Sequence, residues 1–439
     1  MAFGVGYKDR PLREDEIRDL VAKGVEEKGV KDKKVLVILP DHTRTCPIPL
    51  FFRLLCDLIY PQAKQLDFLI ALGTHPPMPD DAIDRLVGMP ADERKRRYPN
   101  ARLFNHMWDN PEHLREVGVI SADEIEEISG GLMREDVRCE CNKMLLEYDL
   151  VSVVGPTFPH EVVGFSGGNK YFFPGVSGPE VLNFFHWLGA VITLPSIIGT
   201  KHNPVRAVVD RAAGFIGVDK LMFSLVVYHN ELHGLYVGEV DEAWSMAADL
   251  SSELHIVYVD KPFTRVLSCA PPMYDDIWTG GKCMYKLEPA LADGAELIIH
   301  APHIEEVSYT HGKMLDEIGY HVRDYFLKRE EMFKHVPRGV MAHSTHVKGI
   351  GTWEDGVETP RVNVVLATRI PRERCERINL GYMNPDEVKF EDWEGRESEG
   401  IVRIPKAGEM LYRLKDGTVP RIPGDPGAEG EEWRPVNRT

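Results

Sequence analysis

A histidine, a glycine-framed loop, a lysine and a second histidine follow one another in the middle of this sequence. The segment P-H-E-V-V-G-F-S-G-G-N-K begins at Pro159, so that His160 precedes Lys170 by ten positions and His186 follows it by sixteen. Glycine permits positive φ and a close approach of the backbone to a ligand, and nothing bulky in the loop shields the lysine. The pattern favours a small molecule held against the main chain beside an amine.

Two well-known motifs overlap this loop, and neither fits it. The residues from Gly164 to Gly168 match G-x-S-x-G, but the nucleophile elbow of hydrolases needs a strand directly before it and a helix directly after it. Here a proline precedes closely and more glycines follow. A P-loop needs Ser or Thr after its lysine, where this chain has Tyr171. A weaker phosphate cradle remains, in which the main-chain amides of Gly167 and Gly168 lie near an anion.

Three short apolar runs in the first half of the chain are each followed by polar residues of catalytic types. Asp41 and Arg44 follow the first run, His75 the second and His160 the third. Open α/β sheets bind ligands at the carboxyl ends of their strands, so we expect these side chains at one sheet edge. The non-functional alternatives are a local salt bridge between Asp41 and Arg44 and a rigid turn that contains His75. The runs predicted to be strands are 35–39, 66–72 and 150–154.

His186 is predicted to lie on a helix that follows the loop. The segment from Ser177 to Glu180 is a predicted capping box with proline in the first turn, so the helix begins there and extends to about Gly189. His186 then lies on its inward side. A lone histidine there is ordinarily a satisfied core residue, and its position relative to Lys170 is what favours a functional role.

The length and composition predict an α/β protein with more than one domain. The chain has 439 residues, of which 43% are apolar, and apolar runs alternate with amphipathic stretches as in folds with largely parallel sheets. A second α/β unit is predicted from about residue 264, with strands at 265–270, 295–300 and 361–368 and a helical stretch at 277–291. We expect an N-terminal domain at 1–265, a C-terminal α/β domain at 266–415 and a loosely packed tail at 416–439.

Charge, hydropathy and cysteine content exclude several classes of function. A net charge of −17 argues against a nucleic-acid binder, because phosphate binding needs clustered Lys and Arg. No apolar run is long enough to span a bilayer, and the first residues lack the features of a signal peptide, so we expect no membrane partner and a cytoplasmic location. The seven cysteines form no CxxC pair and are expected to be reduced thiols.

These motifs, in this order, resemble the nickel-dependent lactate racemase family. The resemblance spans most of the first 265 residues and continues over 272–282. It implies two α/β domains with largely parallel sheets and a cleft between them for cofactor and substrate. It also implies the family's nickel-pincer nucleotide (nickel pyridinium-3,5-bisthiocarboxylic acid mononucleotide) and the cofactor-synthesis enzymes that load it. The segments that carry the resemblance are 41–44, 71–75, 159–175, His186 and 272–282.

The resemblance implies roles for the residues of the loop and the helix after it. Lys170 would be bonded covalently to the cofactor through a thioamide, and His186 would be the protein ligand of the nickel. Sulfur donors with one imidazole suit a square-planar late transition metal, and a lysine of depressed pKa is a good nucleophile for a thioacid. The residues that would contact the cofactor besides Lys170 are Ser166, Gly167, Gly168 and Trp278.

The resemblance also implies an isomerase that inverts C2 of a small anionic 2-hydroxy acid. His75 and His160 would be the acid/base pair, one for each enantiomer, while a hydride passes from C2 to the tethered cofactor. Histidine suits this role because its ordinary pKa lies near neutrality. Arg44 would bind the substrate carboxylate and Asp41 would orient a histidine or this arginine. Lys282 would contact substrate or cofactor, and Thr279 is expected to be a further substrate-binding residue.

Three departures from the family's pattern border the expected substrate site. Thr279 stands where the family has glutamine, Trp278 where it has tyrosine, and Pro76 where it usually has arginine. The shorter side chain of Thr279 leaves room for a larger substrate. We therefore expect a racemase or epimerase of a 2-hydroxy acid larger than lactate, such as a sugar acid or an aromatic hydroxy acid.

Two other functions remain open at this point. A zinc-dependent hydrolase could use His75, His160 and His186 with Asp41 around the metal, but it would leave Lys170 and the glycine loop without a role. A non-catalytic carrier of the pincer cofactor would need Lys170 and not the acid/base histidines.

Overall fold

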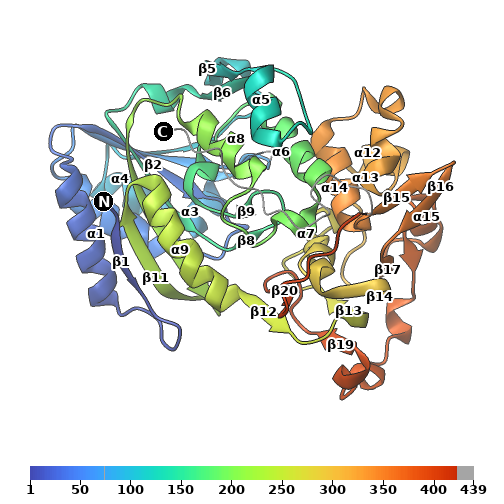
Figure 1. Ribbon diagram of the computed structural model, residues 1–439. Coiled ribbons are helices and arrows are strands. Elements are labelled where there is room, and N and C mark those ends of the chain that lie inside the picture. The colour runs from blue at the N-terminus through green and yellow to red at the C-terminus, as the bar shows by residue number, and fades with distance from the viewer. Residues whose placement is uncertain (74, 423–439) are drawn as a thin grey trace.

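The computed structural model describes residues 1–73 and 75–422, and it has a mixed α/β fold with two main sheets (Figure 1). The larger sheet lies in the N-terminal part of the chain and the smaller one in the C-terminal part. Most strand pairs in both sheets are parallel. The predicted α/β class with largely parallel sheets is therefore confirmed, and the cleft between the domains stays a prediction.

The larger sheet has seven strands in the order β1-β11-β10-β7-β2-β3-β4. The pairs from β10 to β4 are parallel, and β1 and β11 add an antiparallel edge. The predicted strands at 35–39, 66–72 and 150–154 are the neighbours β2, β3 and β7. The bounds are β1 Phe3–Gly6, β2 Lys34–Pro40, β3 Gln65–Ala71, β4 Arg102–Asn105, β7 Leu150–Pro156, β10 Asp219–Tyr228 and β11 Glu231–Gly238.

Both faces of this sheet are buried, and β2 shows why its sequence is apolar throughout. Val35, Val37 and Leu39 pack with helices α1 and α2, whereas Leu36 and Ile38 pack in a second core with α6, α8 and α9. Parallel strands covered on both faces have this continuous apolar pattern. The bounds of these helices are α1 Glu14–Lys28, α2 Ile48–Ile59, α6 Pro179–Ile192, α8 Pro204–Ala213 and α9 Val240–His255.

The smaller sheet has five parallel strands in the order β18-β17-β14-β13-β19. The three strands predicted in this part are β13, β14 and β17. The bounds are β13 Phe263–Cys269, β14 Leu291–Ala301, β17 Asn363–Thr368, β18 Gly381–Tyr382 and β19 Ile401–Ile404. Helices α12 (Gly312–Ile318), α13 (Arg323–Leu327), α14 (Arg338–Lys348) and α15 (Arg372–Arg377) lie in the same part of the chain (Figure 1).

The remaining described elements connect these layers. The helices are α3 Asp80–Val87, α4 Ala91–Arg97, α5 Ala122–Ser129, α7 Leu194–Ile197, α10 Ile277–Gly280, α11 Lys282–Tyr285 and the short 3₁₀ turns η1 Pro111–His113, η2 Lys143–Leu146, η3 Gly168–Tyr171, η4 Glu288–Ala290, η5 Glu330–Phe333, η6 Pro385–Glu387, η7 Phe390–Trp393 and η8 Glu397–Glu399. The strands are β5 Leu114–Ile120, β6 Val137–Asn142, β8 Pro159–His160, β9 Gly164–Phe165, β12 Ile256–Val259, β15 Gly351–Glu354, β16 Val357–Pro360 and β20 Leu411–Leu414.

Two local predictions are wrong in detail. Helix α6 begins at Pro179 as expected, but its N-cap is Gly178 and has no side-chain cap. Glu180 accepts a hydrogen bond from the amide of Arg138 instead, so the capping box does not form. The helical stretch predicted at 277–291 is broken into α10, α11 and η4, and β14 already begins at Leu291.

The two parts of the chain contact each other along α6 and α14 and through a small parallel pairing of β12 with β20 (Figure 1). β20 belongs to the C-terminal part, yet it pairs with β12, the strand that directly follows α9. Because β13 begins at Phe263, we propose that the boundary between the expected domains lies just before this strand rather than at residue 265. Of the predicted tail, 423–439 lie outside the described residues, and Ile422 is buried.

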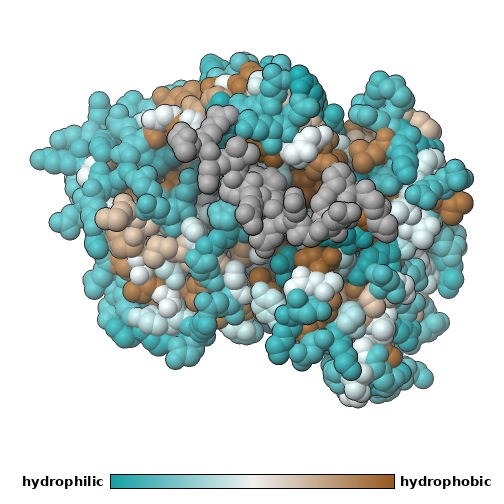
Figure 2. All heavy atoms as spheres, in the orientation of Figure 1, coloured by the Kyte–Doolittle hydropathy of each residue, from teal (hydrophilic) through white to brown (hydrophobic). Residues whose placement is uncertain are grey.

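The face shown in Figure 2 carries mostly hydrophilic side chains with scattered apolar ones. Within the part of the chain that the structure describes, no helix combines the length and apolarity that crossing a membrane requires. All seven cysteines are free, and six of them are buried.

Candidate active site

The glycine-rich loop is held against helices α8 and α9 by its carbonyl groups. Arg206 of α8 donates to the carbonyl oxygen of Gly167 at 3.4 Å, and the indole of Trp244 in α9 donates to the carbonyl oxygen of Ser166 at 2.8 Å. The C=O and the following N–H of a trans peptide point in opposite directions. The amides of Gly167 and Gly168 therefore face away from both helices, an orientation that suits the predicted anion cradle.

The hydroxyl group of Ser166 stabilises the same turn. It donates to the carbonyl oxygen of Pro156 at 2.9 Å and accepts from the amide of Phe158 at 3.0 Å. A hydroxyl engaged in this way is not a poised nucleophile, which agrees with the failure of the elbow motif. The predicted contact between Ser166 and a cofactor stays a prediction.

Lys170 lies in η3, on a backbone that its neighbour fixes. The side-chain amide of Asn169 donates to Asp210 of α8 at 3.1 Å and to Asp241 of α9 at 2.7 Å. The amide of Gly175 donates to the carbonyl oxygen of Lys170 at 3.0 Å and closes the loop on its other side. The lysine thus extends from a segment tied at both ends.

The amine of Lys170 is in an environment that favours its neutral form. Burial lowers its pKa to about 7, and the cations Arg44 and Arg206 act in the same direction, while Glu161 and Asp41 oppose them. A neutral amine is the nucleophilic form, so a large fraction of this lysine is reactive at neutral pH. The predicted covalent attachment has the chemistry it needs at this position.

His186 lies on α6 with one ring nitrogen already bonded. Its Nδ1 lies 2.7 Å from the carbonyl oxygen of Leu182, one turn earlier, so that Nδ1 carries the proton and Nε2 holds a lone pair. Burial lowers its pKa to about 4, and the charge of Lys170 acts in the same direction. A neutral imidazole whose other nitrogen donates to a carbonyl is the usual state of a metal ligand.

His75 and Asp41 form a hydrogen-bonded pair at the ends of β3 and β2. The Nδ1 of His75 donates to one carboxylate oxygen of Asp41, and the hydroxyl of Thr43 donates to the other at 2.6 Å. Burial alone would raise the pKa of Asp41, but these bonds and the Arg44 charge hold the pKa well below its usual range. The carboxylate therefore stays ionised and fixes the His75 tautomer, with the lone pair on Nε2. The predicted orienting role of Asp41 thus has a partner in His75.

His160 is buried, with 5% of its surface exposed, and it is held in the opposite tautomer. The amide of Val162 donates to its Nδ1 at 3.2 Å, so that the neutral ring carries its proton on Nε2. Burial lowers the pKa of His160 well below its usual range, and Lys170, Arg44 and His186 add to this effect. The structure thus brings His160, Lys170 and His186 into one electrostatic environment.

Glu161 is a charged residue of this region that sequence reasoning missed. Its carboxylate lies 3.5 Å from the Nδ1 of His160. Burial would raise its pKa, but the charges of Lys282 and Lys286 help to hold the pKa well below its usual range. The sequence signal that could have identified Glu161 is its position directly after His160, inside the motif that begins at Pro159.

Arg44 is a cation whose charge acts both on the Asp41–His75 pair and on the group around Lys170 and His160. Its charge lowers the pKa of Lys170, His160 and Lys282, and its guanidinium lies 5.8 Å from the ring centre of Phe158. A guanidinium in the middle of a group of ionisable residues is suited to binding a carboxylate in a bidentate manner. Its predicted contact with the substrate carboxylate is consistent with this position and stays a prediction.

The C-terminal part contributes Lys282, Thr279 and Trp278 to the same region. Burial lowers the pKa of Lys282 to about 8, with Arg44 adding to the effect and Glu161 opposing it. The hydroxyl of Thr279, in contrast, donates to the Asp276 carboxylate at 3.0 Å. Its predicted substrate contact would have to replace this local bond.

Trp278 is surrounded by histidines that sequence reasoning also missed. Its ring stacks on His343 of α14 at 4.2 Å and packs against His311 at 4.5 Å. Burial lowers the pKa of His343 well below its usual range, and the charges of His346, His311 and His186 also act on it. The sequence signal that could have identified His343 is its spacing of three residues from His346, which places both histidines on one side of a helix.

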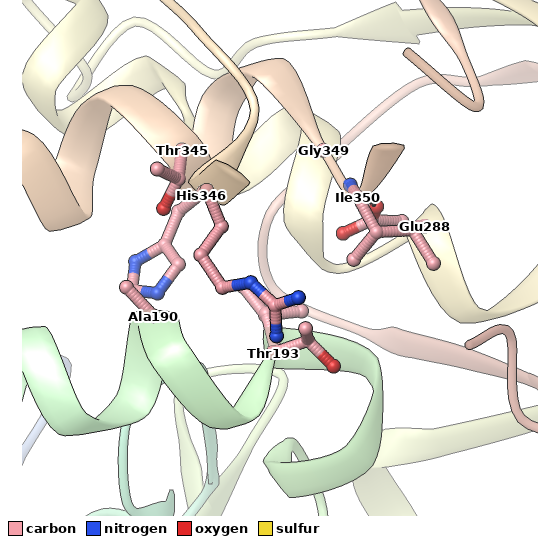
Figure 3. Close-up of a pocket in the computed structure, with 9 residues that line it drawn as sticks. Ala190, Thr193, Glu288, Thr345, His346, Gly349 and Ile350 are labelled. Atoms are coloured by element: carbon pink, nitrogen blue, oxygen red, sulfur yellow. Dashed lines mark hydrogen bonds between the residues drawn. The ribbon is translucent and has the colours of Figure 1, made fainter. Parts of the chain in front are cut away.

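A small cavity lies between α6 and α14 (Figure 3). Ala190, one turn after His186, and His346 line it, and Glu288 faces it from η4. The Nε2 of His346 and the Oε2 of Glu288 are buried and make no hydrogen bond to the described residues. Burial raises the pKa of Glu288 to about 7, while the amide of Ile350 bonded to its other oxygen opposes this.

The family model of the lactate racemase N-terminal domain matches residues 9–194, a range that includes Asp41, His75, His160, Lys170 and His186. This part of the chain belongs to the lactate racemase family. The lactate racemase of Thermoanaerobacterium thermosaccharolyticum is 24% identical over 310 residues, which are 67% of this chain and 67% of that protein. The lactate racemase of Lactiplantibacillus plantarum is 24% identical over 303 residues, 67% of this chain and 64% of that protein.

Two solved structures share the fold of this chain over nearly all of its length. A Thermotoga maritima protein is 34% identical, with a TM-score of 0.83, and the match covers 94% of this chain and all of that one (100%). The lactate racemase apoprotein of T. thermosaccharolyticum is 19% identical, with a TM-score of 0.69 and the same coverage. The second likeness shows the fold alone.

Proposed function

We propose that this lactate racemase family member is an isomerase that inverts C2 of a small 2-hydroxy acid. The observation that carries the proposal is the shared environment of Lys170, His160 and His186, with the Asp41-paired His75 connected to it through Arg44. These are the residues that the resemblance assigns to cofactor, metal and acid/base chemistry.

The residues present fit a nickel-pincer nucleotide. Lys170 offers an amine that is largely neutral near pH 7, His186 offers Nε2 as a ligand, and the amides of Gly167 and Gly168 face away from the supporting helices. When bound, this cofactor would supply an acceptor for the hydride of C2. Its attachment at Lys170 and its nickel are part of the proposal.

The two histidines have complementary proton states for work on the substrate hydroxyl. His75 holds a lone pair on Nε2 and accepts the hydroxyl proton there, while Asp41 stabilises the imidazolium that forms. His160 carries its proton on Nε2 and donates a hydrogen bond from that atom. Arg44 binds the substrate carboxylate. The burial of His160 excludes water from the proton that it holds.

The substrate is proposed to be larger than lactate. Thr279 is short and turned toward Asp276, and the neighbouring wall consists of the Trp278, His311 and His343 rings. These neutral rings favour a side chain with a ring or several hydroxyls over a methyl group. Chiral chromatography after incubation with lactate, gluconate-type acids and aromatic 2-hydroxy acids tests reaction and substrate together.

Two measurements separate this proposal from its alternatives. Intact mass spectrometry of protein produced with the cofactor-synthesis enzymes should show an adduct on the Lys170 peptide, and Lys170→Ala should abolish it. A non-catalytic carrier would show the adduct and keep every measurable property when His75 and His160 are replaced.

A zinc hydrolase is disfavoured by the geometry, because within residues 1–73 and 75–422 no three His, Cys, Asp or Glu side chains converge as metal ligands.

A further inference from the structure

Lys286 belongs to the C-terminal part of the chain, but its amine reaches into the N-terminal part. The residue directly follows α11, and 2% of it is exposed. Its Nζ donates to the carbonyl oxygen of Pro159 at 2.5 Å. Pro159 immediately precedes His160, so this bond is made to the backbone that carries a proposed acid/base residue.

The same amine lies near a second residue before His160, and the charge of the residue after His160 acts on it. It lies 5.6 Å from the ring centre of Phe158, within the range of a cation-π interaction. The Glu161 carboxylate compensates its charge. One side chain thus binds the carbonyl oxygen of Pro159, lies near the ring of Phe158 and interacts electrostatically with Glu161.

A buried ammonium group is costly unless it is hydrogen-bonded and compensated. Burial lowers the pKa of Lys286 to about 7, with Lys282 and Arg44 adding to the effect and Glu161 opposing it. The bond to Pro159 and the charge of Glu161 are therefore what make this position tolerable. Both partners lie in the N-terminal part, so the amine is satisfied only while the two parts are packed together.

We propose that Lys286 is a positioning residue that holds His160 in its working place and couples that place to the packing of the two parts of the chain. The proposal rests on the proposed function only for the use of His160 in catalysis. The coupling itself is a property of the apoprotein. Arg44 packs near the same Phe158 ring, so a displaced segment 158–161 would also disturb the proposed carboxylate site.

A matched control exists in Lys348, a second buried lysine. Its Nζ donates to the carbonyl oxygen of Asn379 at 2.6 Å, and both residues lie in the C-terminal part. Lys286→Met and Lys348→Met each remove one buried amine-carbonyl hydrogen bond. Only the first removes a bond to the His160 segment.

The test uses the full chain with ¹³C-labelled histidine, and the His160 resonance is assigned with His160→Gln. We expect Lys286→Met to shift and broaden this resonance in the apoprotein, and Lys348→Met to leave it in place. In the loaded enzyme, Lys286→Met should lower kcat by about 10²-fold, as a misplaced catalytic group does, with little change in KM. Lys286→Arg keeps a cationic donor and should recover part of the loss.

An unchanged His160 resonance in folded Lys286→Met, or an equal change in Lys348→Met, overturns the proposal. If Lys286→Met does not fold, the Lys286→Arg resonance decides, since a longer donor must move the segment if the two are coupled. Absence of any racemase activity in the wild type would contradict the proposed function and leave the resonance comparison intact as the test of Lys286.

Discussion

The Nδ1 of His186 lies 2.7 Å from the carbonyl oxygen of Leu182, and this bond fixes what the rest of the imidazole can do. The donor nitrogen is used within α6, and Nε2 keeps its lone pair. Because burial also lowers the pKa of His186 to about 4, the ring is neutral over the whole physiological range. A residue that the family resemblance implies as a metal ligand thus has the protonation state that a ligand needs.

Replacing His186 by alanine should lower the nickel content of protein produced with the cofactor-synthesis enzymes. The physical reason is the loss of the Nε2 donor, and metal analysis of the purified protein measures it. His255→Ala is the control, because His255 is also buried with a pKa lowered to about 4, but its ring nitrogens are bonded to Ser251 and to the Val227 carbonyl. Equal nickel content in His186→Ala and wild type would remove His186 from the site.

Lys170 should react with an acylating reagent with a midpoint near pH 7. Burial, Arg44 and Arg206 lower its pKa to about 7, so the neutral amine predominates above that pH. Labelling of the apoprotein across pH 5–10, read by peptide mass spectrometry, measures this midpoint. A midpoint near 10 would mean that the amine is solvated.

The same pKa shift of Lys170 predicts how the free energy of unfolding depends on pH. The folded-state pKa of Lys170 is lower than that of the unfolded chain, so between about pH 7 and pH 10 the unfolded chain binds more protons. The free energy of unfolding should therefore rise with pH in this window more steeply in the wild type than in Lys170→Met. Parallel curves for the two proteins would contradict the shift.

Gly168→Ala should destabilise the protein more than Gly130→Ala does. Both glycines have positive φ, +60° and +67°, so alanine is strained at each by about 1 kcal/mol. A Cβ at Gly168 would lie 2.8 Å from Cγ of Trp244, whereas Gly130 has open space around it. Overpacking should add about 1–3 kcal/mol at Gly168, measured by urea unfolding. If both substitutions lower the free energy of unfolding equally, the Trp244 side chain moves at little cost and does not support the loop.

The parallel strands of the larger sheet could be predicted because their patterns are local. The apolar runs around Val37 and Val153 are buried on both faces, and continuous hydrophobicity is the signature of such strands. The predicted helix at 277–291 is broken after Gly280 and again after Tyr285, and only the first break has a local signal, the glycines at 280 and 281. The capping box failed at Glu180 because Arg138, far away in sequence, competes for the carboxylate.

The site was predictable only where one segment carries the signal. Lys170 and His160 share a motif, and His186 follows on the next helix. Lys286 and His343 reach the same region from the C-terminal part, and nothing in their local sequence shows that their partners are Pro159 and Trp278. Contacts between distant segments depend on tertiary packing, between the two parts of the chain for Lys286 and within the C-terminal part for His343, and periodicity and spacing do not encode it.

Thr279→Val tests whether the hydroxyl at this position binds the substrate. In the structure the Thr279 hydroxyl donates to Asp276, three residues earlier, so its removal should cost about 1 kcal/mol of stability and change kcat/KM by less than about threefold. Thr200→Val is the control, because the Thr200 hydroxyl likewise donates three residues back, to the Ile197 carbonyl at 2.6 Å. If Thr279→Val instead lowers kcat/KM by about 10²-fold while Thr200→Val does not, the hydroxyl must leave Asp276 and bind the substrate. That outcome would show that the pocket rearranges when the substrate enters.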